Sequence, residues 1–582
     1  MVWVAARKWT IGWCVLVVIQ AALPVITIVL TRATIDHLTT FFTKQSAWND
    51  SGLWFLSLAI VVAWLAGQAA ASVMSIVRTN QTELVKDYLA DKIHSQAASL
   101  DIEFYDNPLM FDLMHRVRNE TQQPVLLLEH GGLIVQNLIT ILGLSVILAS
   151  YSLWLTLILL ASIVPGLFFV SGFIRRELRW KVENTPKERR QSYYDVLLTE
   201  RSSAPEMRMF DLCGHLRKKY QLLRKEFRQG RLALAIKGLK TELAAGLAGW
   251  AGITSGMGWM FVQTLRKNAK LGDLVLCFQT FQQGQAMIRS LVESASKIYL
   301  SLIYLEQLFT LLDMKHRGTI PGESIAMPVP LTEGIRFELV HFRYPNSDRN
   351  ILNGLSFTVK AGELTTLVGL NGAGKSTIIK LLCRFYDPTA GSIMIDGIDL
   401  RQFAENDVRR SVSVLFQDFM FYHTTVAENI VMGDVTAADD HVRTRRAAMG
   451  ACADEVIARL SDGYDTEIGW FFGGQNLSYG QWQRLALTRT LFKESPIILL
   501  DEPTSAMDPW TETLWLKRIR KWSAGHTVII ITHRFTTAMH ADRVVLVQEG
   551  RVTEQGTHEQ LLALNGLYAE NWRTQYKEMT TT

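Results

Sequence analysis

The chain has 582 residues, of which 48% are apolar and 20% are charged, and its formal net charge is only +5. Such a weak charge gives no sign of a nucleic-acid partner, and we expect none. The five cysteines, Cys14, Cys213, Cys277, Cys383 and Cys452, lack the close spacing of a zinc site or a disulfide framework, so we expect reduced structural thiols.

The first half of the chain contains apolar runs that are long enough to cross a membrane as helices. A bilayer core of about 30 Å needs about 20 apolar residues. Four runs have this length: 11–31, 52–77, 244–262 and 271–300. A further run, 131–174, has 44 residues without a charge. As one helix it would be about 66 Å long, so we expect two spans joined by a turn near 150–152. The sequence therefore predicts six spans rather than the helices of a soluble core, which rarely stay uncharged for so long.

The charge of the segments between the spans predicts their orientation. Segment 175–240 carries eighteen Lys and Arg, and more basic residues precede the first span and lie in 78–125. The short segments 36–51 and 263–270 would then lie outside, although the second of them is basic, against the rule. The first run is too long for a signal-peptide core and lacks a small-x-small cleavage site, so we expect a retained span. Both termini are expected in the cytoplasm.

The last predicted span carries several polar side chains: Gln279, Gln282, Gln283 and Gln285, with Arg289 and Glu293 further on. Polar side chains within a span are costly and usually face a bundle interior or a water-filled cavity. We expect Gln279, Gln282 and Gln283 to line a pathway through the membrane. The alternative is that they form hydrogen bonds between helices.

The composition changes after residue 314. Segment 315–332 contains Gly and Pro without periodicity, which is typical of a linker. We therefore expect a transmembrane domain over 1–314 and a soluble domain over 333–582. The soluble domain begins with two segments that alternate as strands do.

The second of these strand segments leads into "GLNGAGKST", Gly369 to Thr377, which fits the phosphate-binding pattern GxxxxGK(S/T). Glycines in this pattern let backbone N–H groups surround the phosphates of a nucleotide. Lys375 would reach the outer phosphates, and Ser376 would bind Mg²⁺. The expected nucleotide-binding residues are Gly369, Asn371, Gly372, Gly374, Lys375, Ser376 and Thr377.

A second acidic motif follows in "IILLDEPTSAMD", where four apolar residues form a buried strand that ends in Asp501 and Glu502. Asp501 is placed to hold Mg²⁺ together with Ser376. Glu502 is placed to polarise an attacking water as a general base. The sequence thus predicts a domain that binds ATP and Mg²⁺ and hydrolyses ATP.

These motifs, in this order, resemble the ABC transporter family over nearly the whole chain. The resemblance implies a polytopic α-helical membrane domain of the type I exporter kind, followed by an α/β P-loop ATPase domain. It implies further roles for residues of the soluble domain. Tyr344 would stack on adenine, Gln417 in "LFQD" would contact nucleotide and Mg²⁺, and His533 in "ITHR" would be the switch histidine. The signature element is "LSYGQ", whose nucleotide-binding residues would be Ser478, Gly480 and Gln481.

Two cytoplasmic segments of the membrane half, 100–116 and 204–212, look like the coupling helices of ABC exporters. In that family such helices dock on the nucleotide domains. The resemblance assigns this coupling role to four residues: Tyr105, Arg116, Glu206 and Phe210.

The chain departs from the family pattern at Tyr479, where the signature has glycine, and in "GWFFGGQN" before the signature. The second departure resembles a branch of bacterial peptide and drug exporters. We expect a working signature, because a decayed site would also have changed Glu502 or His533. A second possibility is that Tyr479 marks a signature that no longer functions.

In this family, each ATP lies between the phosphate loop of one domain and the signature of another, so a chain with one nucleotide domain must pair. We expect a homodimer, or a heterodimer with a homologous half-transporter. The expected function is ATP-driven export of an amphipathic compound, a peptide, a drug or a lipid, across the cytoplasmic membrane. The alternatives are a siderophore-type importer with this architecture and an ATP-gated channel or regulatory protein.

Overall fold

The computed structural model describes residues 1–581 except 45–50, 108–109, 111–112, 115, 118–122, 267–268, 315–324 and 346. The chain divides into two compact units. The first comprises Met1–Ser99 and Asp112–Met314, and the second comprises Leu100–Phe111 and Lys315–Thr582. The short segment Leu100–Phe111 therefore belongs to the same unit as the C-terminal part of the chain. Most of the predicted linker lies outside the described residues.

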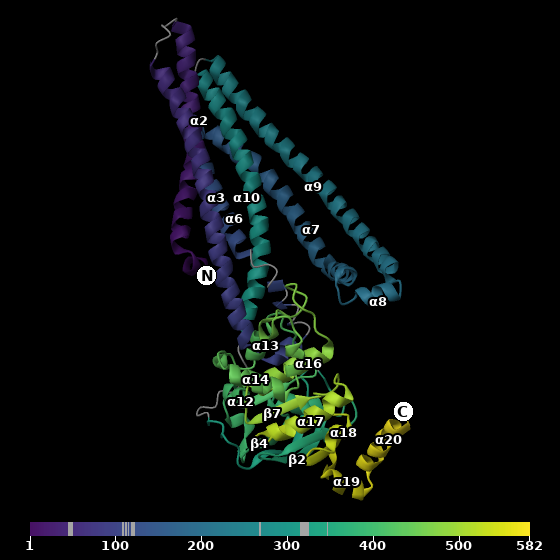
Figure 1. The fold of residues 1–582 in the computed structure, drawn as a ribbon. Coiled ribbons are helices and arrows are strands. Elements are labelled where there is room, and N and C mark those ends of the chain that lie inside the picture. The colour runs from purple at the N-terminus through teal and green to yellow at the C-terminus, as the bar shows by residue number, and fades with distance from the viewer. Residues whose placement is uncertain are drawn as a thin grey trace. The chain divides into compact units, whose positions relative to one another are not determined.

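The first unit is built from long helices (Figure 1). Among the described residues these are α2 (Arg7–Lys44), α3 (Ser51–Ser99), α6 (Gln123–Tyr151), α7 (Leu153–Thr199), α9 (Leu212–Leu265) and α10 (Leu271–Leu312), with the short helices α1 (Val2–Ala5) and α8 (Ala204–Met209). Each of the six predicted spans falls within one long helix, and the expected turn separates α6 from α7. Judged by length and composition alone, three segments of the described chain are able to cross a membrane, Arg7–Phe42, Gly52–Ser99 and Gln123–Tyr151.

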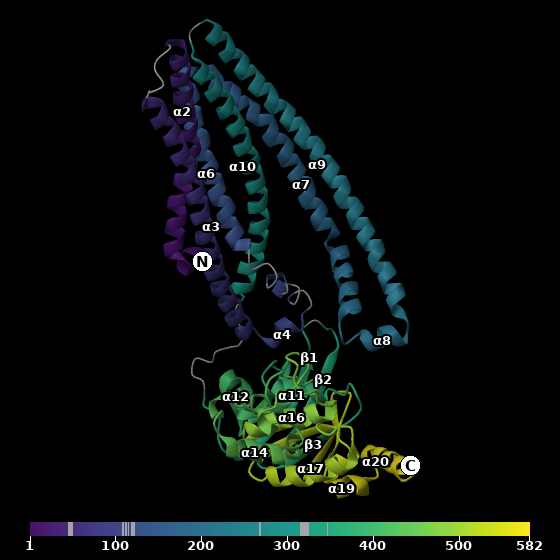
Figure 2. The same ribbon diagram turned by 45° about the horizontal axis from the view of Figure 1, so that its top comes forward.

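The long helices pack in pairs, α7 with α9, α2 with α3, and α6 with α10 (Figure 2). Glycines of α9 allow close contacts of this helix with α7 and with α10. A Cβ on Gly252 would lie 2.4 Å from the Ser162 Cβ, and one on Gly256 would lie 2.8 Å from the Phe281 ring. Small residues at these positions allow neighbouring helices to approach, as in other membrane bundles.

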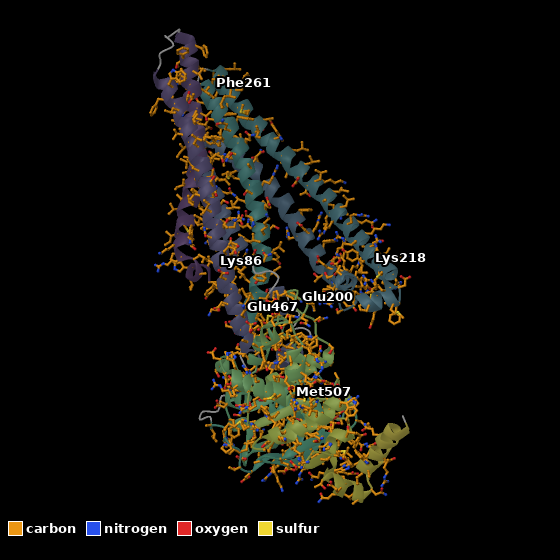
Figure 3. All side chains as sticks on the ribbon, in the orientation of Figure 1. Lys86, Glu200, Lys218, Phe261, Glu467 and Met507 are labelled. Carbon is orange, nitrogen blue, oxygen red and sulfur yellow. The ribbon has the colours of Figure 1, made fainter. Side chains whose placement is uncertain are left out.

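Figure 3 shows the side chains of this unit, and on α9 their character changes along the helix. On α9, Phe261 lies in the predicted span and is exposed, whereas Lys218 lies in the basic segment of the same helix. Exposed apolar side chains over such a length are what a bilayer would cover. The helix is therefore apolar in its membrane part and basic beyond it.

A cluster of charged and polar side chains joins three helix ends on the side of the expected outer segments. Arg32 Nε lies 2.8 Å from the Asp273 carboxylate, and the Tyr151 hydroxyl donates to the same carboxylate at 2.9 Å. The Gly272 N–H donates to Asp36. These contacts connect the end of α2, the end of α6 and the beginning of α10.

The second unit contains two sheets. The larger has the strand order β10-β9-β3-β8-β7-β6, and the smaller has the order β2-β1-β4-β5. The strand bounds are β1 (Gly334–Arg343), β2 (Asn350–Lys360), β3 (Leu364–Val368), β4 (Ala390–Ile395), β5 (Ile398–Asp399), β6 (Val412–Leu415), β7 (Ile497–Asp501), β8 (Thr527–Thr532), β9 (Arg543–Gln548) and β10 (Arg551–Gly556). The two segments predicted as strands are β1 and the run from β2 into β3.

Strands β3, β6, β7 and β8 are parallel and apolar, and β3, β7 and β8 are buried along their whole length. Parallel sheets of this kind are covered by helices on both faces. The helices of this unit are α4 (Ile102–Tyr105), α11 (Lys375–Leu382), α12 (Glu405–Ser411), α13 (Val426–Val431), α14 (His441–Gly450), α15 (Asp454–Ala458), α16 (Tyr479–Phe492), α17 (Pro509–Trp522), α18 (Phe535–Ala538), α19 (His558–Leu564) and α20 (Leu567–Thr581). Ligands of such sheets bind beyond the carboxyl ends of the parallel strands.

Candidate nucleotide site

The segment predicted to bind phosphate is a loop between a buried strand and a helix, since β3 ends just before Gly369 and α11 begins at Lys375. Gly369 has a φ of +155°, and a Cβ there would lie 2.1 Å from the Val547 carbonyl oxygen, so the position requires glycine. The Lys375 ammonium donates to the carbonyls of Gly369 at 2.7 Å and Leu370 at 2.9 Å. Burial lowers the pKa of Lys375. The loop thus surrounds one buried lysine, as a phosphate cradle requires.

The two predicted acids lie where β7 ends. Asp501 is buried, burial raises its pKa, and the Ser376 hydroxyl forms a hydrogen bond to it. Glu502 has a φ of +49°, which is unusual for a residue with a side chain. Its N–H donates to the Ile531 carbonyl at 2.9 Å, and its Oε1 lies 3.1 Å from His533 Nδ1. Two residues 31 positions apart in the sequence, Glu502 and His533, are therefore side by side.

One cavity of about 870 Å³ brings the predicted nucleotide residues together. Its lining includes Tyr344, Gly369, Asn371, Gly372, Gly374, Lys375, Ser376, Thr377, Gln417, Asp501, Glu502 and His533. Four residues of the C-terminal helix α20 also line it: Leu567, Asn571, Thr574 and Gln575. No sequence motif had pointed to α20. The predicted signature residues, Ser478, Gly480 and Gln481, are not part of this lining.

Three side chains of this cavity offer oxygen ligands of the kind that Mg²⁺ prefers, namely the Ser376 hydroxyl, the Gln417 amide oxygen and the Asp501 carboxylate. The Ser376 hydroxyl is already within hydrogen-bonding distance of Asp501. The donor set predicted from the sequence therefore fits Mg²⁺.

Tyr344, predicted to stack on adenine, is part of an aromatic cluster beside the phosphate loop. Its hydroxyl is 3.3 Å from the Thr377 hydroxyl, and its ring centroid is 4.9 Å from that of Phe342 and 5.4 Å from that of Tyr386. The Lys380 ammonium lies 5.2 Å from the centre of the Tyr344 ring. These neighbours fix the orientation of the ring.

The signature segment begins a helix as predicted. Ser478 is the N-cap of α16: its hydroxyl accepts from the Gln481 N–H at 3.4 Å, and the Gln481 side chain accepts from the Ser478 N–H at 2.8 Å. Tyr479 is the first helical residue and has no positive φ. Its ring centroid lies 5.4 Å from that of Phe419 and 6.1 Å from that of Phe421. The ring rests on the surface of its own domain, and half of the side chain is exposed.

The signature helix also contacts the segment that follows Asp501 and Glu502. A Cβ on Gly480 would lie 2.5 Å from the Ala506 carbonyl oxygen, so glycine is needed there for a close approach of backbone. The buried side-chain amide of Gln483 donates to the Glu502 carbonyl at 3.0 Å and to the Ser505 hydroxyl at 2.9 Å. It also accepts from the Ala506 N–H at 3.1 Å. No sequence motif identified Gln483, although a polar residue on the buried face of this helix was a usable signal.

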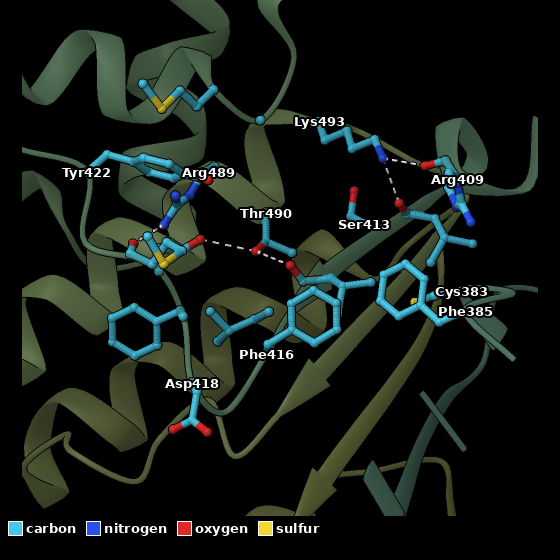
Figure 4. A pocket seen from close by; sticks show the side chains of 18 residues that line it. Cys383, Phe385, Arg409, Ser413, Phe416, Asp418, Tyr422, Arg489, Thr490 and Lys493 are labelled. Carbon is cyan, nitrogen blue, oxygen red and sulfur yellow. Dashed lines mark hydrogen bonds between the residues drawn. The ribbon is translucent and has the colours of Figure 1, made fainter. Parts of the chain in front are cut away.

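A second cavity, of about 450 Å³, begins next to Gln417 and is largely apolar (Figure 4). Its lining includes Phe416, Phe419, Met420 and Tyr422, and the Arg489 guanidinium lies 4.5 Å from the centre of the Tyr422 ring. On another side of the cavity, Lys493 donates to backbone carbonyls of the strand β6 region. Met420 is 63% exposed, so apolar surface is accessible at this cavity.

Of the predicted coupling segments, the first contains α4 and the second contains α8. The Phe104 side chain is buried, and the Tyr386 hydroxyl donates to the Asp106 carboxylate, which also lies 3.7 Å from Lys380 Nζ. Tyr105 is 43% exposed. Much of the chain between Asn107 and Arg116 lies outside the described residues, and Arg116 itself is exposed.

The second segment presents an apolar surface. Glu206 lies in the first turn of α8, and Met207 is buried. Met209 and Phe210, at the end of α8, are 82% and 66% exposed. Two large apolar side chains in water at the end of a short helix are typical of a contact surface.

The polar residues of the last span differ in their surroundings. The Gln285 amide donates to the Gly249 carbonyl of α9, which is a contact between helices. Gln279 Oε1 is buried and has no hydrogen-bond partner among the described residues. Gln282 is exposed and Gln283 is half-buried. The packing alternative therefore applies to Gln285. Among the described residues, Gln279, Gln282 and Gln283 form no such hydrogen bond to a neighbouring helix.

Comparison with known proteins gives likenesses over both units. A family model described as ABC transporter matches residues 352–505. The chain is similar to the subtilin transport ATP-binding protein SpaT of Bacillus subtilis, at 30% identity over 82% of this chain and 78% of that protein. It is similar to the ATP-dependent lipid A-core flippase of Xanthomonas campestris pv. campestris strain 8004, at 28% identity over 90% of this chain and 88% of that protein. Among solved structures, a bacterial Atm1-family ABC exporter with ATP bound matches with a TM-score of 0.83 at 26% identity, over 98% of this chain and 99% of the other.

Proposed function

This chain belongs to the ABC transporter family as an exporter-type half-transporter, and we propose that it uses ATP hydrolysis to export an amphipathic compound across the cytoplasmic membrane. The observation that carries the proposal is the single cavity that gathers the phosphate loop, both acids and His533. Similarity to a subtilin transport protein and to a lipid A-core flippase supports a peptide or a lipid as the class of cargo.

In the proposed mechanism, this chain's own residues bind ATP and activate water. Tyr344 stacks on the adenine and Lys375 contacts the outer phosphates, for which its buried position in the loop is suited. Glu502 accepts a proton from the attacking water, and His533, 3.1 Å from it, orients the carboxylate. Mg²⁺ would be held by Ser376, Gln417 and Asp501 and would neutralise charge on the phosphates.

We further propose that the complete site needs a second chain. Ser478, Gly480 and Gln481 begin a helix, and the N-terminus of a helix attracts an anion. They do not line the cavity of their own chain, so they are available to the ATP of a partner. Two identical chains related by a two-fold axis would satisfy both sites at once. A homologous half-transporter is the other possible partner.

The proposed coupling runs through the two short cytoplasmic helices. The Tyr386 hydroxyl and Lys380 hold Asp106, next to Tyr105, and both Tyr386 and Lys380 contact the Tyr344 ring. A change at the adenine would therefore reach the first coupling segment through three side chains.

For the second coupling segment, with Glu206 and Phe210, we propose docking on the nucleotide domain of the partner chain. The exposed Met209 and Phe210 match in character the apolar cavity of Figure 4. Arg116, in the first coupling segment, would also take part in docking on a nucleotide domain.

For the cargo, we propose a pathway along α10 that includes Gln279, Gln282 and Gln283. Support comes from Gln279 Oε1, which has no hydrogen-bond partner among the described residues, and from the exposed Gln282, since polar groups within a span normally face a bundle interior, water or a ligand. Both termini and the nucleotide domain would lie in the cytoplasm, in agreement with the basic segment 175–240.

The test is transport by the purified protein in proteoliposomes. A peptide or lipid carrying a fluorescent label should move to the side away from the nucleotide domain only when ATP and Mg²⁺ are supplied. It should also stimulate ATPase, whereas Glu502→Gln should show neither activity. An ATP-dependent ion current without cargo movement would instead identify a channel. Movement of cargo toward the nucleotide domain would identify an importer.

A further inference from the structure

The C-terminal helix α20 is firmly attached to the nucleotide domain at its beginning. The Glu554 carboxylate accepts from the Leu567 N–H at 2.7 Å and from the Tyr568 N–H at 3.1 Å, which satisfies two free donors of the first turn. Tyr568 is fully buried, and its hydroxyl is 2.8 Å from His558 Nδ1. This part of the helix is therefore a fixed element of the domain.

The apolar face of α20 packs against the two segments that flank the catalytic residues. The Tyr568 ring centroid lies 5.1 Å from that of Phe535, the first residue of α18, two positions after His533. Val368, the last residue of the strand before the phosphate loop, belongs to the same buried cluster. A shift of α20 would therefore move both the segment after His533 and the strand before the phosphate loop.

About two turns beyond Tyr568, Gln575 forms hydrogen bonds to the backbone on both sides of Arg534, next to His533. Its Nε2 donates to the His533 carbonyl at 2.9 Å, and its Oε1 accepts from the Phe535 N–H at 3.1 Å. One side-chain amide thus satisfies the peptide groups on either side of Arg534, as a neighbouring strand would. Two simultaneous hydrogen bonds fix both the position and the direction of this short segment.

The segment is also held from its other side. Arg534 Nη1 lies 2.6 Å from the Glu512 carboxylate, and the Arg534 N–H donates to the Thr532 hydroxyl at 3.0 Å. The His533 side chain, in contrast, is half exposed and meets Glu502 at 3.1 Å. The direction of the imidazole is therefore set by the backbone that Gln575 and Arg534 hold between them.

We infer that Gln575 is a positioning residue for ATP hydrolysis. We also infer that α20, which lines the nucleotide site, affects its activity. Gln575 keeps the His533 backbone in the place from which the imidazole reaches Glu502. Neighbouring residues Asn571 and Thr574 face the same cavity. Displacement of α20, by a partner or by nucleotide, would lower turnover through His533. This inference rests on the proposed ATPase function.

The experiment compares two variants of Gln575 with a control on the same helix. Gln575→Ala removes both hydrogen bonds, whereas Gln575→Glu keeps the acceptor for the Phe535 N–H and loses the donor to His533. Arg573→Gln changes an exposed side chain two positions away and serves as the matched control. Full-length protein in nanodiscs is used throughout, and three quantities are measured: amide exchange of Phe535, the Kd for ATP, and kcat.

For Gln575→Ala we expect about tenfold faster exchange at Phe535 and about tenfold lower kcat, the factor that one ordinary hydrogen bond contributes. The Kd for ATP should change less than about twofold, because the substitution acts on the position of His533 and leaves the rest of the nucleotide domain folded. Gln575→Glu should retain protection at Phe535 but lose kcat, and Arg573→Gln should resemble the wild type.

Unchanged Phe535 exchange in Gln575→Ala would overturn the inference, as would faster exchange with normal kcat. If Gln575→Ala does not fold, Gln575→Glu decides through kcat, and a normal kcat in folded Gln575→Glu protein would overturn the inference. Wild-type protein without ATPase activity would refute the proposed function instead. The exchange rate at Phe535 would still report on the contact, so the two failures are distinguishable.

Discussion

The side chain of Gln483 in the signature helix donates a hydrogen bond to the backbone carbonyl of Glu502, with the two atoms 3.0 Å apart. The same amide holds Ser505 and Ala506 of the following loop. In the proposed dimer, Ser478 contacts the ATP bound by the partner chain, whereas Glu502 of the same polypeptide acts on the ATP bound by its own phosphate loop. Gln483 therefore connects the two ATP sites within one polypeptide.

The first prediction follows from this connection. Gln483→Leu removes all three hydrogen bonds and should uncouple the two sites, so the Hill coefficient for ATP should fall from above 1 to about 1. The measurement is ATPase activity over a range of ATP concentrations. Thr490→Val on the same helix is the control, because it removes hydrogen bonds to the Val414 and Ala486 carbonyls instead of those to Glu502, Ser505 and Ala506. Equal Hill coefficients in both variants would show that Gln483 only stabilises the fold.

The second prediction concerns Glu502 itself. Glu502→Gln keeps the size of the side chain but removes the base, so turnover should fall by at least about a hundredfold, as general-base effects are worth about 10² to 10⁴. ATP binding should persist, and the variant should accumulate as a closed dimer with ATP bound. Phosphate release and gel filtration with ATP measure these two effects. Near-normal turnover by the purified variant would remove Glu502 from its proposed role.

The features that could be predicted from the sequence are those that depend on local patterns of residues. The uncharged run 131–174 exceeds a bilayer, so its division into α6 and α7 followed from length alone. The phosphate loop was recognisable because a tight ring of backbone needs glycine at fixed positions, and Gly369 shows the close approach that enforces it.

What the sequence did not predict depends on contacts between distant segments. Gln575 lies 42 positions after His533, and Tyr386 lies 280 positions after Asp106. A glutamine on a helix, or a tyrosine in the bend after α11, has no local feature that identifies its partner. Likewise, four similar glutamines in one span gave no sign that Gln285 alone among them would bind the backbone of α9.

The third prediction tests the second coupling segment. Phe210→Ala should uncouple transport from ATP hydrolysis, because it removes an exposed apolar side chain while leaving the nucleotide cavity intact. Cargo movement and ATPase are measured in the same proteoliposomes, and ATP affinity should stay nearly unchanged. Leu222→Ala, an exposed apolar residue elsewhere in the basic part of α9, is the control. Joint loss of ATP binding and transport would assign Phe210 a structural role.

The fourth prediction concerns the polar face of α10. Replacing Gln279, Gln282 and Gln283 together by Ala should change cargo-stimulated ATPase more than basal ATPase, because these side chains would meet the cargo. Gln285→Ala is the comparison, since Gln285 packs on Gly249 and its loss should affect both activities alike. If the triple variant also loses both activities to the same degree, these glutamines serve packing.

The fifth prediction answers whether tyrosine breaks the signature. Tyr479 occupies the first position of α16 with an ordinary φ, so the helix begins without strain. Its ring leans on Phe419 and Phe421, away from the capping bonds between Ser478 and Gln481. The elements that would contact a phosphate are therefore unaffected by the ring. Glycine at this position would restore the family pattern but remove the two aromatic contacts.

Tyr479→Gly should accordingly keep ATPase within a few-fold of wild type, and Tyr479→Phe, which keeps the ring, should match it more closely. Gly480→Asp should abolish ATPase, because it sets a carboxylate where the partner's γ-phosphate is proposed to bind. Its Cβ would also meet the Ala506 carbonyl, at 2.5 Å in the present backbone, so thermal unfolding and ATP binding must be measured alongside. A folded variant that binds ATP without hydrolysing it supports the signature role, and an unfolded one points to the contact with Ala506. If the wild-type protein has no ATPase activity and Tyr479→Gly restores it, tyrosine had inactivated the signature.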